Sequence, residues 1–197
     1  MRKRLLALIS AAILALSFAG CDEAVLDELF GEYEETGSTV SASSDSSEAL
    51  EGKDGPYEVV KVVDGDTLKL MINGEKKNVR LIGIDTPESV HPTEEKNVPE
   101  GTLASDHTKE LVGDSEVYIE YGTEPQDRYG RPLCYVYLPD GTMLNEKILE
   151  DGYAKVLIVG KNKEYKERFY EIQDEAKAEG RGLWPTGVFD DSDASKK

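Results

Sequence analysis

Five short stretches of the chain have the composition of β-strands: the first two are rich in β-branched residues and alternate roughly between apolar and polar positions, and the last is an apolar run. The stretches cover residues 57–63, 67–72, 77–84, 116–121 and 133–138. Asp64-Gly65-Asp66 separates the first two stretches, and Asn73-Gly74 separates the second from the third. Because both are turn-forming sequences, we expect the first three strands to form antiparallel hairpins.

Three other stretches have the spacing that is typical of helices. Residues 100–112 place Leu103, Ala104, His107 and Leu111 on one stripe, and residues 143–149 and 163–179 give two more helices. Five short strands with about three helices predict an α+β fold, which we expect to be a five-stranded β-barrel of the oligonucleotide/oligosaccharide-binding (OB) type. The domain is expected to span residues 57–185 and to be followed by a polar tail over residues 186–197.

The N-terminus has the pattern of a secretory signal peptide. A basic start at residues 2–4 precedes an unbroken apolar and small-residue run at residues 5–18, which is too short to span a bilayer comfortably. The sequence before Cys21 resembles the cleavage motif of bacterial lipoproteins, with Phe18 where leucine is usual. We predict a signal over residues 1–20, lipidation of Cys21 and an anchor on the outer face of the cytoplasmic membrane. Full secretion is the alternative.

Charge separates the next segment from the domain. The 197 residues carry 23 Lys+Arg against 40 Asp+Glu, a formal charge of −17. Residues 22–56 hold eleven acids and one base, Lys53, around a serine-rich run. Because low hydrophobicity with net charge keeps a segment disordered, residues 21–56 are expected to form an acidic, serine-rich tether. The acid excess argues against non-specific coating of nucleic acid, and Cys21 and Cys134 alone indicate neither a disulfide framework nor a zinc site.

Candidate chemistry is concentrated in three clusters: Asp64-Gly65-Asp66-Thr67, residues 80–88 and residues 127–131. Alternation in the second cluster predicts that Arg80 shares a face with Ile82 and Ile84, and an arginine on such a face needs an anionic partner. Arg80 and Arg131 have planar guanidinium groups that can each bind two oxygens of a phosphate. The two arginines therefore indicate a phosphate-binding site.

The carboxylates complete this candidate site. Asp66 and Asp85 are oxygen donors suited to calcium or magnesium, and the Thr86 carbonyl can add a third oxygen. Glu88 is a further carboxylate that can orient or deprotonate a water. Because negative charge grows on the phosphate oxygens during attack on a phosphodiester, a cation, paired guanidinium groups and a base are the groups that this reaction requires.

The same residues resemble a known family. Asp64-Gly65-Asp66-Thr67, the segment from Arg80 to Asp85-Thr86-Pro87-Glu88, and Tyr129-Gly130-Arg131 are similar in order and spacing to the staphylococcal nuclease (thermonuclease) family. The resemblance covers about residues 57–184. It implies an OB barrel and calcium-dependent hydrolysis of DNA and RNA.

The resemblance also implies a role for each residue. Asp66, Asp85 and the Thr86 carbonyl would hold calcium, Arg80 and Arg131 would bind and stabilise the phosphate, and Glu88 would act on the water. Arg128 and Tyr129 match positions that contact a terminal phosphate, which implies products with a 3′-phosphate.

The sequence departs from the family pattern at one place that bears on affinity. The family often has tyrosine after its second helix, where the ring can stack on a base, but residues 155–160 contain none. Because stacking contributes about 1–3 kcal/mol per base, we expect weaker nucleotide binding with the catalytic step largely kept.

Two functional hypotheses follow from these residues. The first is a monomeric, lipid-anchored nuclease that needs no obligate protein partner. The alternative is a catalytically silent OB-fold lipoprotein that binds nucleic acid or protein. All positions expected to act in cleavage are filled, which favours the enzyme.

Overall fold

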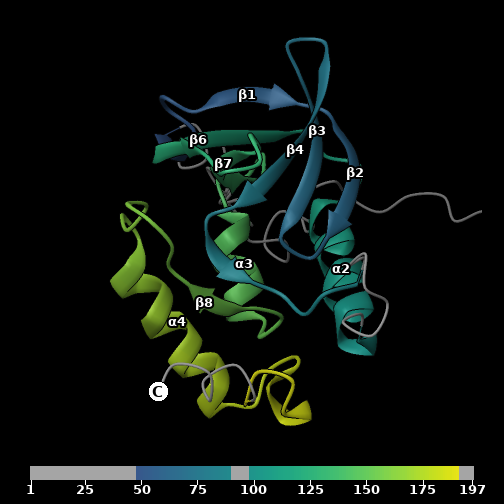
Figure 1. Ribbon diagram of the computed structural model, residues 1–197, viewed down its shortest axis with the longest axis vertical. Helices are drawn as coiled ribbons and strands as arrows, with labels where there is room; N and C mark the ends of the chain where they lie inside the picture. The colour runs from purple at the N-terminus through teal and green to yellow at the C-terminus, as the bar shows by residue number, and fades with distance from the viewer. Residues whose placement is uncertain (1–47, 90–97, 191–197) are drawn as a thin grey trace, which may run out of the picture. The chain divides into compact units, whose positions relative to one another are not determined.

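The computed structural model describes residues 48–89 and 98–190, and these residues form an α+β arrangement with three α-helices and a mixed sheet (Figure 1). The strands are β1 (Asp54–Tyr57), β2 (Val59–Asp64), β3 (Thr67–Ile72), β4 (Glu75–Leu81), β5 (Gly83–Asp85), β6 (Val117–Gln126), β7 (Pro132–Tyr137) and β8 (Lys155–Leu157). The helices are α2 (Pro99–Val112), α3 (Leu144–Glu150) and α4 (Lys166–Ala178), with a 3-10 turn at Trp184–Thr186. The predicted signal peptide, Cys21 and residues 191–197 lie outside the described residues.

Six of the strands form one sheet in the order β1-β6-β7-β4-β3-β2. Neighbouring strands are antiparallel except β4 and β7, which run parallel, with Arg80 opposite Leu133. β5 and β8 form a separate antiparallel pair. Between residues 48 and 190, apart from the undescribed gap, no ladder joins the edge strands β1 and β2, so the closed five-stranded barrel expected from the sequence is not detected.

The predicted helices and the strands expected at residues 57–63, 67–72 and 133–138 are found close to their expected bounds. The strand expected at residues 116–121 extends five residues further, to Gln126, and the strand expected at residues 77–84 is divided. β4 ends at Leu81, and the chain enters β5 at Gly83 with a φ of +81°. A Cβ atom at Gly83 would lie 2.5 Å from the Phe169 ring, so glycine is required here for two reasons. The bend ends the alternation: Arg80 lies opposite Thr67, whereas Ile82 and Ile84 are both buried in the core. The three residues therefore do not belong to one continuous strand, although Arg80, Ile82 and Ile84 all line the same pocket.

Two strands were not predicted. β1 begins at Asp54, three residues before the expected first strand, and pairs with β6. β8 is short and pairs with β5, so the chain after α3 lies directly beside the second chemical cluster. Both strands extend the structure beyond what alternation alone indicated.

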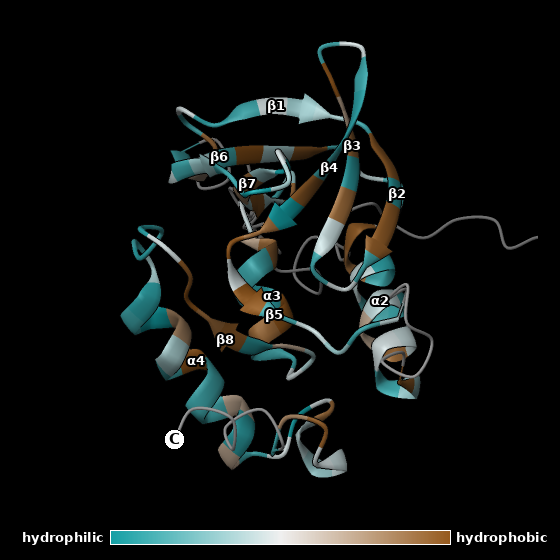
Figure 2. Ribbon diagram, viewed as in Figure 1, coloured by the Kyte–Doolittle hydropathy of each residue, from teal (hydrophilic) through white to brown (hydrophobic). Residues whose placement is uncertain are grey.

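One hydrophobic core holds the sheet, β5, α3 and α4 together. Side chains with hardly any exposed surface come from the sheet (Leu68, Leu70, Val79 and Leu81), from β5 (Ile84), from α3 (Ile148 and Leu149) and from α4 (Phe169). Figure 2 shows hydrophobic residues interrupted by the hydrophilic Lys69 along β3, whereas β4 begins with four hydrophilic residues and alternates only over Val79, Arg80 and Leu81. Within the described ranges, no helix is both long and apolar enough to cross a membrane.

Candidate active site

The first cluster is a tight turn between β2 and β3. A Cβ atom at Gly65 would lie 2.8 Å from the Thr86 side chain, so glycine lets this turn approach the second cluster closely. The Thr108 hydroxyl of α2 donates a hydrogen bond of 2.8 Å to the Gly65 carbonyl. The turn is therefore held between the second cluster and α2.

Asp66 is the buried carboxylate of the site, with 1% of its surface exposed. Its Oδ1 accepts hydrogen bonds from the Thr67 hydroxyl (3.0 Å) and from the Arg80 guanidinium, and its Oδ2 accepts one from the Thr86 N–H (3.1 Å). Burial raises the pKa of Asp66 to about 6, although the Arg80 charge and the Thr86 hydrogen bond oppose this shift. The negative charge of Asp66 is thus only partly compensated by the protein.

Arg80 connects two of the clusters. Besides its ion pair with Asp66, its Nη2 donates to Asp85 Oδ1 (3.0 Å) and to the Ile84 carbonyl (3.3 Å). Asp85 Oδ2 also lies 3.7 Å from Lys155 Nζ of β8. The sequence prediction that Arg80 needs an anionic partner is confirmed, with two carboxylates in that role.

Glu88 is the last residue of the second cluster and is exposed. Its carbonyl accepts a hydrogen bond of 3.0 Å from the Val98 N–H, at the start of α2. A Cβ atom at Gly101 would lie 2.3 Å from that carbonyl. The first turn of α2 therefore packs directly against the Glu88 main chain and fixes its position.

The third cluster is a loop between β6 and β7 that is organised by Asp127. Its Oδ1 accepts hydrogen bonds from the N–H groups of Tyr129 and Arg131 (2.9 Å each), and its Oδ2 accepts one from Arg131 Nε (2.7 Å). Partial burial raises the pKa of Asp127, but these hydrogen bonds outweigh it and hold the pKa below its ordinary value. Because Arg131 is bound through Nε, its terminal Nη groups can face a ligand.

Tyr129 joins the two arginines of this loop. Its hydroxyl accepts a hydrogen bond of 2.6 Å from Arg128 Nη2, and the guanidinium carbons of Arg128 and Arg131 lie 4.7 Å and 5.7 Å from its ring centroid. The ring is 69% exposed. Tyr129 therefore orders both arginines at the surface.

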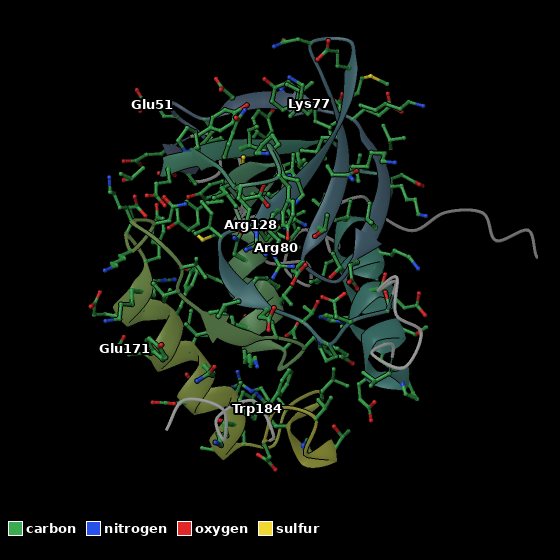
Figure 3. The ribbon with its side chains drawn as sticks, viewed as in Figure 1. Glu51, Lys77, Arg80, Arg128, Glu171 and Trp184 are labelled. Carbon is green, nitrogen blue, oxygen red and sulfur yellow. The ribbon has the colours of Figure 1, made fainter. Side chains whose placement is uncertain are left out.

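One pocket of about 640 Å³ brings the predicted catalytic and substrate-binding residues together. Its lining includes Arg80, Glu88, Arg128, Tyr129 and Arg131. Figure 3 labels Arg80 and Arg128, which lie near one another at the centre of the view. The lining also includes aliphatic side chains, among them Leu133, Leu157 and Val159. Asp66, Asp85 and Thr86 adjoin this pocket through the contacts of Arg80 and Asp66.

The residues expected to hold a metal fit a hard cation. The described part of the chain has no group of three His, Cys, Asp or Glu side chains that could form a metal site. Of the residues expected from the sequence to bind metal, two are carboxylates, Asp66 and Asp85, and both contact Arg80. The Thr86 hydroxyl beside them is buried and has no hydrogen-bond partner. The negative charge of the buried Asp66 is only partly compensated, and the neighbouring Thr86 hydroxyl oxygen has no hydrogen-bond partner. These oxygens suit calcium, which also binds carbonyl and water oxygens.

Three residues that support the site were not predicted. Thr108 holds the first turn and Asp127 holds Arg131, as described above. Asn145 is buried at the start of α3, where Oδ1 accepts from the Val136 N–H (2.9 Å) and Nδ2 donates to the Ile82 carbonyl (2.9 Å). It thus ties β7 to the bend between β4 and β5. Asp127 belongs to the third cluster, but the sequence assigned it no role. For Thr108 and Asn145 the sequence signal was a polar residue, which is common on any surface.

Comparisons with known proteins show which family the chain resembles. A family model described as "Staphylococcal nuclease homologue" matches residues 78–186. The chain is 39% identical to the thermonucleases of Staphylococcus hyicus and Staphylococcus intermedius over 128 residues, which cover 65% of this chain and 75% of each relative. It is 37% identical to endonuclease YncB of Bacillus subtilis (strain 168) over 126 residues, covering 63% of this chain and 59% of the relative.

Proposed function

The chain belongs to the staphylococcal nuclease family and is a nuclease, and from this premise we propose that it is a calcium-dependent phosphodiesterase that hydrolyses DNA and RNA. One observation carries the proposal. Arg80, Arg131 and Glu88 line one pocket, and Arg80 at the same time contacts both carboxylates of the candidate metal site. Guanidinium groups for the phosphate, a carboxylate for the water and oxygens for a cation therefore adjoin one another.

The residues that would hold calcium are Asp66, Asp85 and the Thr86 carbonyl. When bound there, the ion would supply positive charge that stabilises the phosphate during attack. Asp66 and Asp85 are held toward each other by Arg80, so the protein keeps two negative carboxylates close together before a cation is present.

The remaining residues act on the phosphate and the water. Arg80 and Arg131 bind phosphate oxygens through their terminal nitrogens, and the hydrogen bonds become stronger as negative charge grows on these oxygens. Glu88, fixed by α2 at the pocket, orients a water or removes its proton. Arg128 and Tyr129 contact a terminal phosphate. Water attacks the phosphorus, the P–O5′ bond breaks and the 5′ oxygen leaves with a proton from solvent, so the phosphate stays on the 3′ oxygen of the other product.

The test is a nuclease assay on the full chain with calcium and with a chelator. We expect hydrolysis of DNA and RNA only with calcium, and a loss of at least about 100-fold for Arg80→Ala, Glu88→Ala and Arg131→Ala. Arg131→Lys is also strongly impaired, because a point charge does not replace the planar guanidinium. Arg168→Ala is the matched control, since Arg168 pairs with Glu146 away from the pocket. Calcium-independent hydrolysis, or full activity of the three alanine variants, contradicts the proposal.

We also propose that the sheet is an OB barrel, that the chain acts as a monomer, and that lipidation of Cys21 anchors it on the outer face of the cytoplasmic membrane. The support for the anchor is the sequence at residues 1–21. Metabolic labelling with a fatty acid tests it, because Cys21→Ala should lose the label and release the protein into the medium.

A further inference from the structure

Two lysines lie directly opposite each other on neighbouring strands next to the active site. Lys61 of β2 pairs with Lys69 of β3, and Lys69 in turn lies opposite Asn78 of β4. Lys61 and Asn78 are exposed and Lys69 is partly buried. We call these three residues the lysine row. Since like charges directly opposite on a sheet are destabilising, the pairing of Lys61 with Lys69 costs stability in the protein alone.

The lysines of the row have no acidic partner among the residues described. Neither the Lys61 nor the Lys69 side chain forms an ion pair or hydrogen bond there. Nearby lysines do form ion pairs, as Lys77 does with Glu75 and Lys109 with Asp106. In a chain with 40 acids and 23 bases, two lysines directly opposite each other without an acid form a local patch of positive charge.

The lysine row is continuous with the active site in two directions. Along β3, Thr67 is two residues from Lys69, so it lies on the same face, and it pairs with Arg80. Across the sheet, Asn78 and Arg131 line a shared hollow of about 340 Å³ beside the active-site pocket. Because neighbouring strands lie about 4.8 Å apart, the row extends about 10 Å across the sheet from Asn78 to Lys61.

We propose that the lysine row binds the phosphate backbone of the nucleic-acid strand beyond the phosphate that is cleaved. The ligand is a polyanion, because two positive side chains and an amide follow one another on a single line that leads from Arg131. An anionic lipid surface offers similar charge, but the continuity with Arg80 and Arg131 favours the strand that these arginines bind. The inference deepens the proposed nuclease function and depends on it for the identity of the strand.

The test compares two double variants of the full chain with equal net charge. Lys61→Gln/Lys69→Gln removes the lysines of the row, and Lys163→Gln/Lys166→Gln removes two lysines near the start of α4 that also lack ion pairs among described residues. Each is measured on a single-stranded DNA 12-mer and on a dinucleotide, which is too short to reach the row. We expect the row variant to raise KM for the 12-mer about 5- to 10-fold, with kcat and the dinucleotide kinetics unchanged.

Salt dependence gives a second readout. Each lost phosphate contact lowers the slope of log affinity against log salt by about 0.7 for a single strand, so the row variant should lose about 1.4 in slope and the control none. Binding is measured with a fluorescent 12-mer in the Glu88→Ala background. The row variant should also be at least as stable as the parent in urea, because it removes a like-charge pair.

Three outcomes would overturn the inference. Equal effects of both double variants show a response to net charge alone. An unchanged KM for the 12-mer shows that the strand does not reach the row. Loss of binding to vesicles of anionic lipid, with unchanged 12-mer kinetics, assigns the row to a membrane surface. Failure of the proposed nuclease function gives a different result. The wild-type protein would then not hydrolyse the dinucleotide in the presence of calcium, and the binding measurement with the 12-mer would still test the lysine row.

Discussion

Asp127→Asn separates the position of Arg131 from the integrity of its loop. The asparagine Oδ1 can still accept from the N–H groups of Tyr129 and Arg131, so the backbone of the loop keeps its hydrogen bonds. The asparagine Nδ2 group replaces Asp127 Oδ2, the carboxylate oxygen that accepts a hydrogen bond from Arg131 Nε. Two donors then face each other, and the guanidinium loses its anchor.

The expected effects on stability and catalysis differ in size. Arg131 is 36% exposed and the Asp127 side chain 16%, so solvent screening limits the contribution of their ion pair to about 0.5–1 kcal/mol of folding stability. Complete removal of a transition-state donor lowers kcat about 100- to 1000-fold, and a mobile guanidinium keeps part of that interaction. We therefore expect kcat to fall about 5- to 10-fold in Asp127→Asn.

The assay is a double-mutant cycle on kcat with the 12-mer, with urea unfolding as the control for folding. If Asp127 acts by positioning Arg131, Asp127→Asn has no further effect in the Arg131→Ala background. A decrease of similar size in that background shows that Asp127 acts through another group. An unchanged kcat in the single variant, with Arg131→Ala strongly impaired, would refute the positioning argument.

Three other predictions concern stability and binding. Asn145→Ala leaves buried backbone groups unpaired, so urea unfolding should show a loss of about 3–5 kcal/mol, and a loss below about 1 kcal/mol contradicts the role given to Asn145. In the metal-free protein the raised pKa of Asp66, about 6 against 3.8 for its ordinary value, means that the folded state binds this proton more readily than the unfolded state. Its contribution should stabilise the fold by about 1 kcal/mol as the pH falls from 7 to 5, and urea unfolding in a chelator should show that Asp66→Asn lacks this gain. A nucleoside bisphosphate should inhibit this protein more weakly than it inhibits a relative that has tyrosine in the segment corresponding to residues 155–160. Equal inhibition constants for the two proteins rule out the stacking argument.

Alternation and turn residues were sufficient for the regular strands, since β3 has the bounds expected from residues 67–72. They failed where tertiary contacts decide the conformation. The left-handed Gly83 packs against Phe169, more than 80 residues away, and no local pattern reveals that contact. β1 was missed because Asp54-Gly55-Pro56 has turn composition, and β8 because an isolated three-residue strand forms no recognisable alternation.

The sequence predicted more of the candidate site than of the strand bounds. Charged residues in three spaced clusters indicated phosphate chemistry, and the structure brings Arg80, Glu88, Arg128, Tyr129 and Arg131 into one pocket. The supporting residues could not be predicted in this way. Thr108 and Asn145 act by bonding backbone groups far away in sequence, so their importance depends on the fold and not on their neighbours.

The division of the chain at Gly83 means that the site is assembled from two separate sheets. Arg80 belongs to the six-stranded sheet, whereas Asp85 belongs to β5, which pairs only with β8 and packs under α4 through Gly83 and Phe169. A chain in which the C-terminal half has not yet docked has the arginine but not the second carboxylate in place. Newly made or truncated chains should consequently have no nuclease activity, and activity should appear only after α4 has packed against β5.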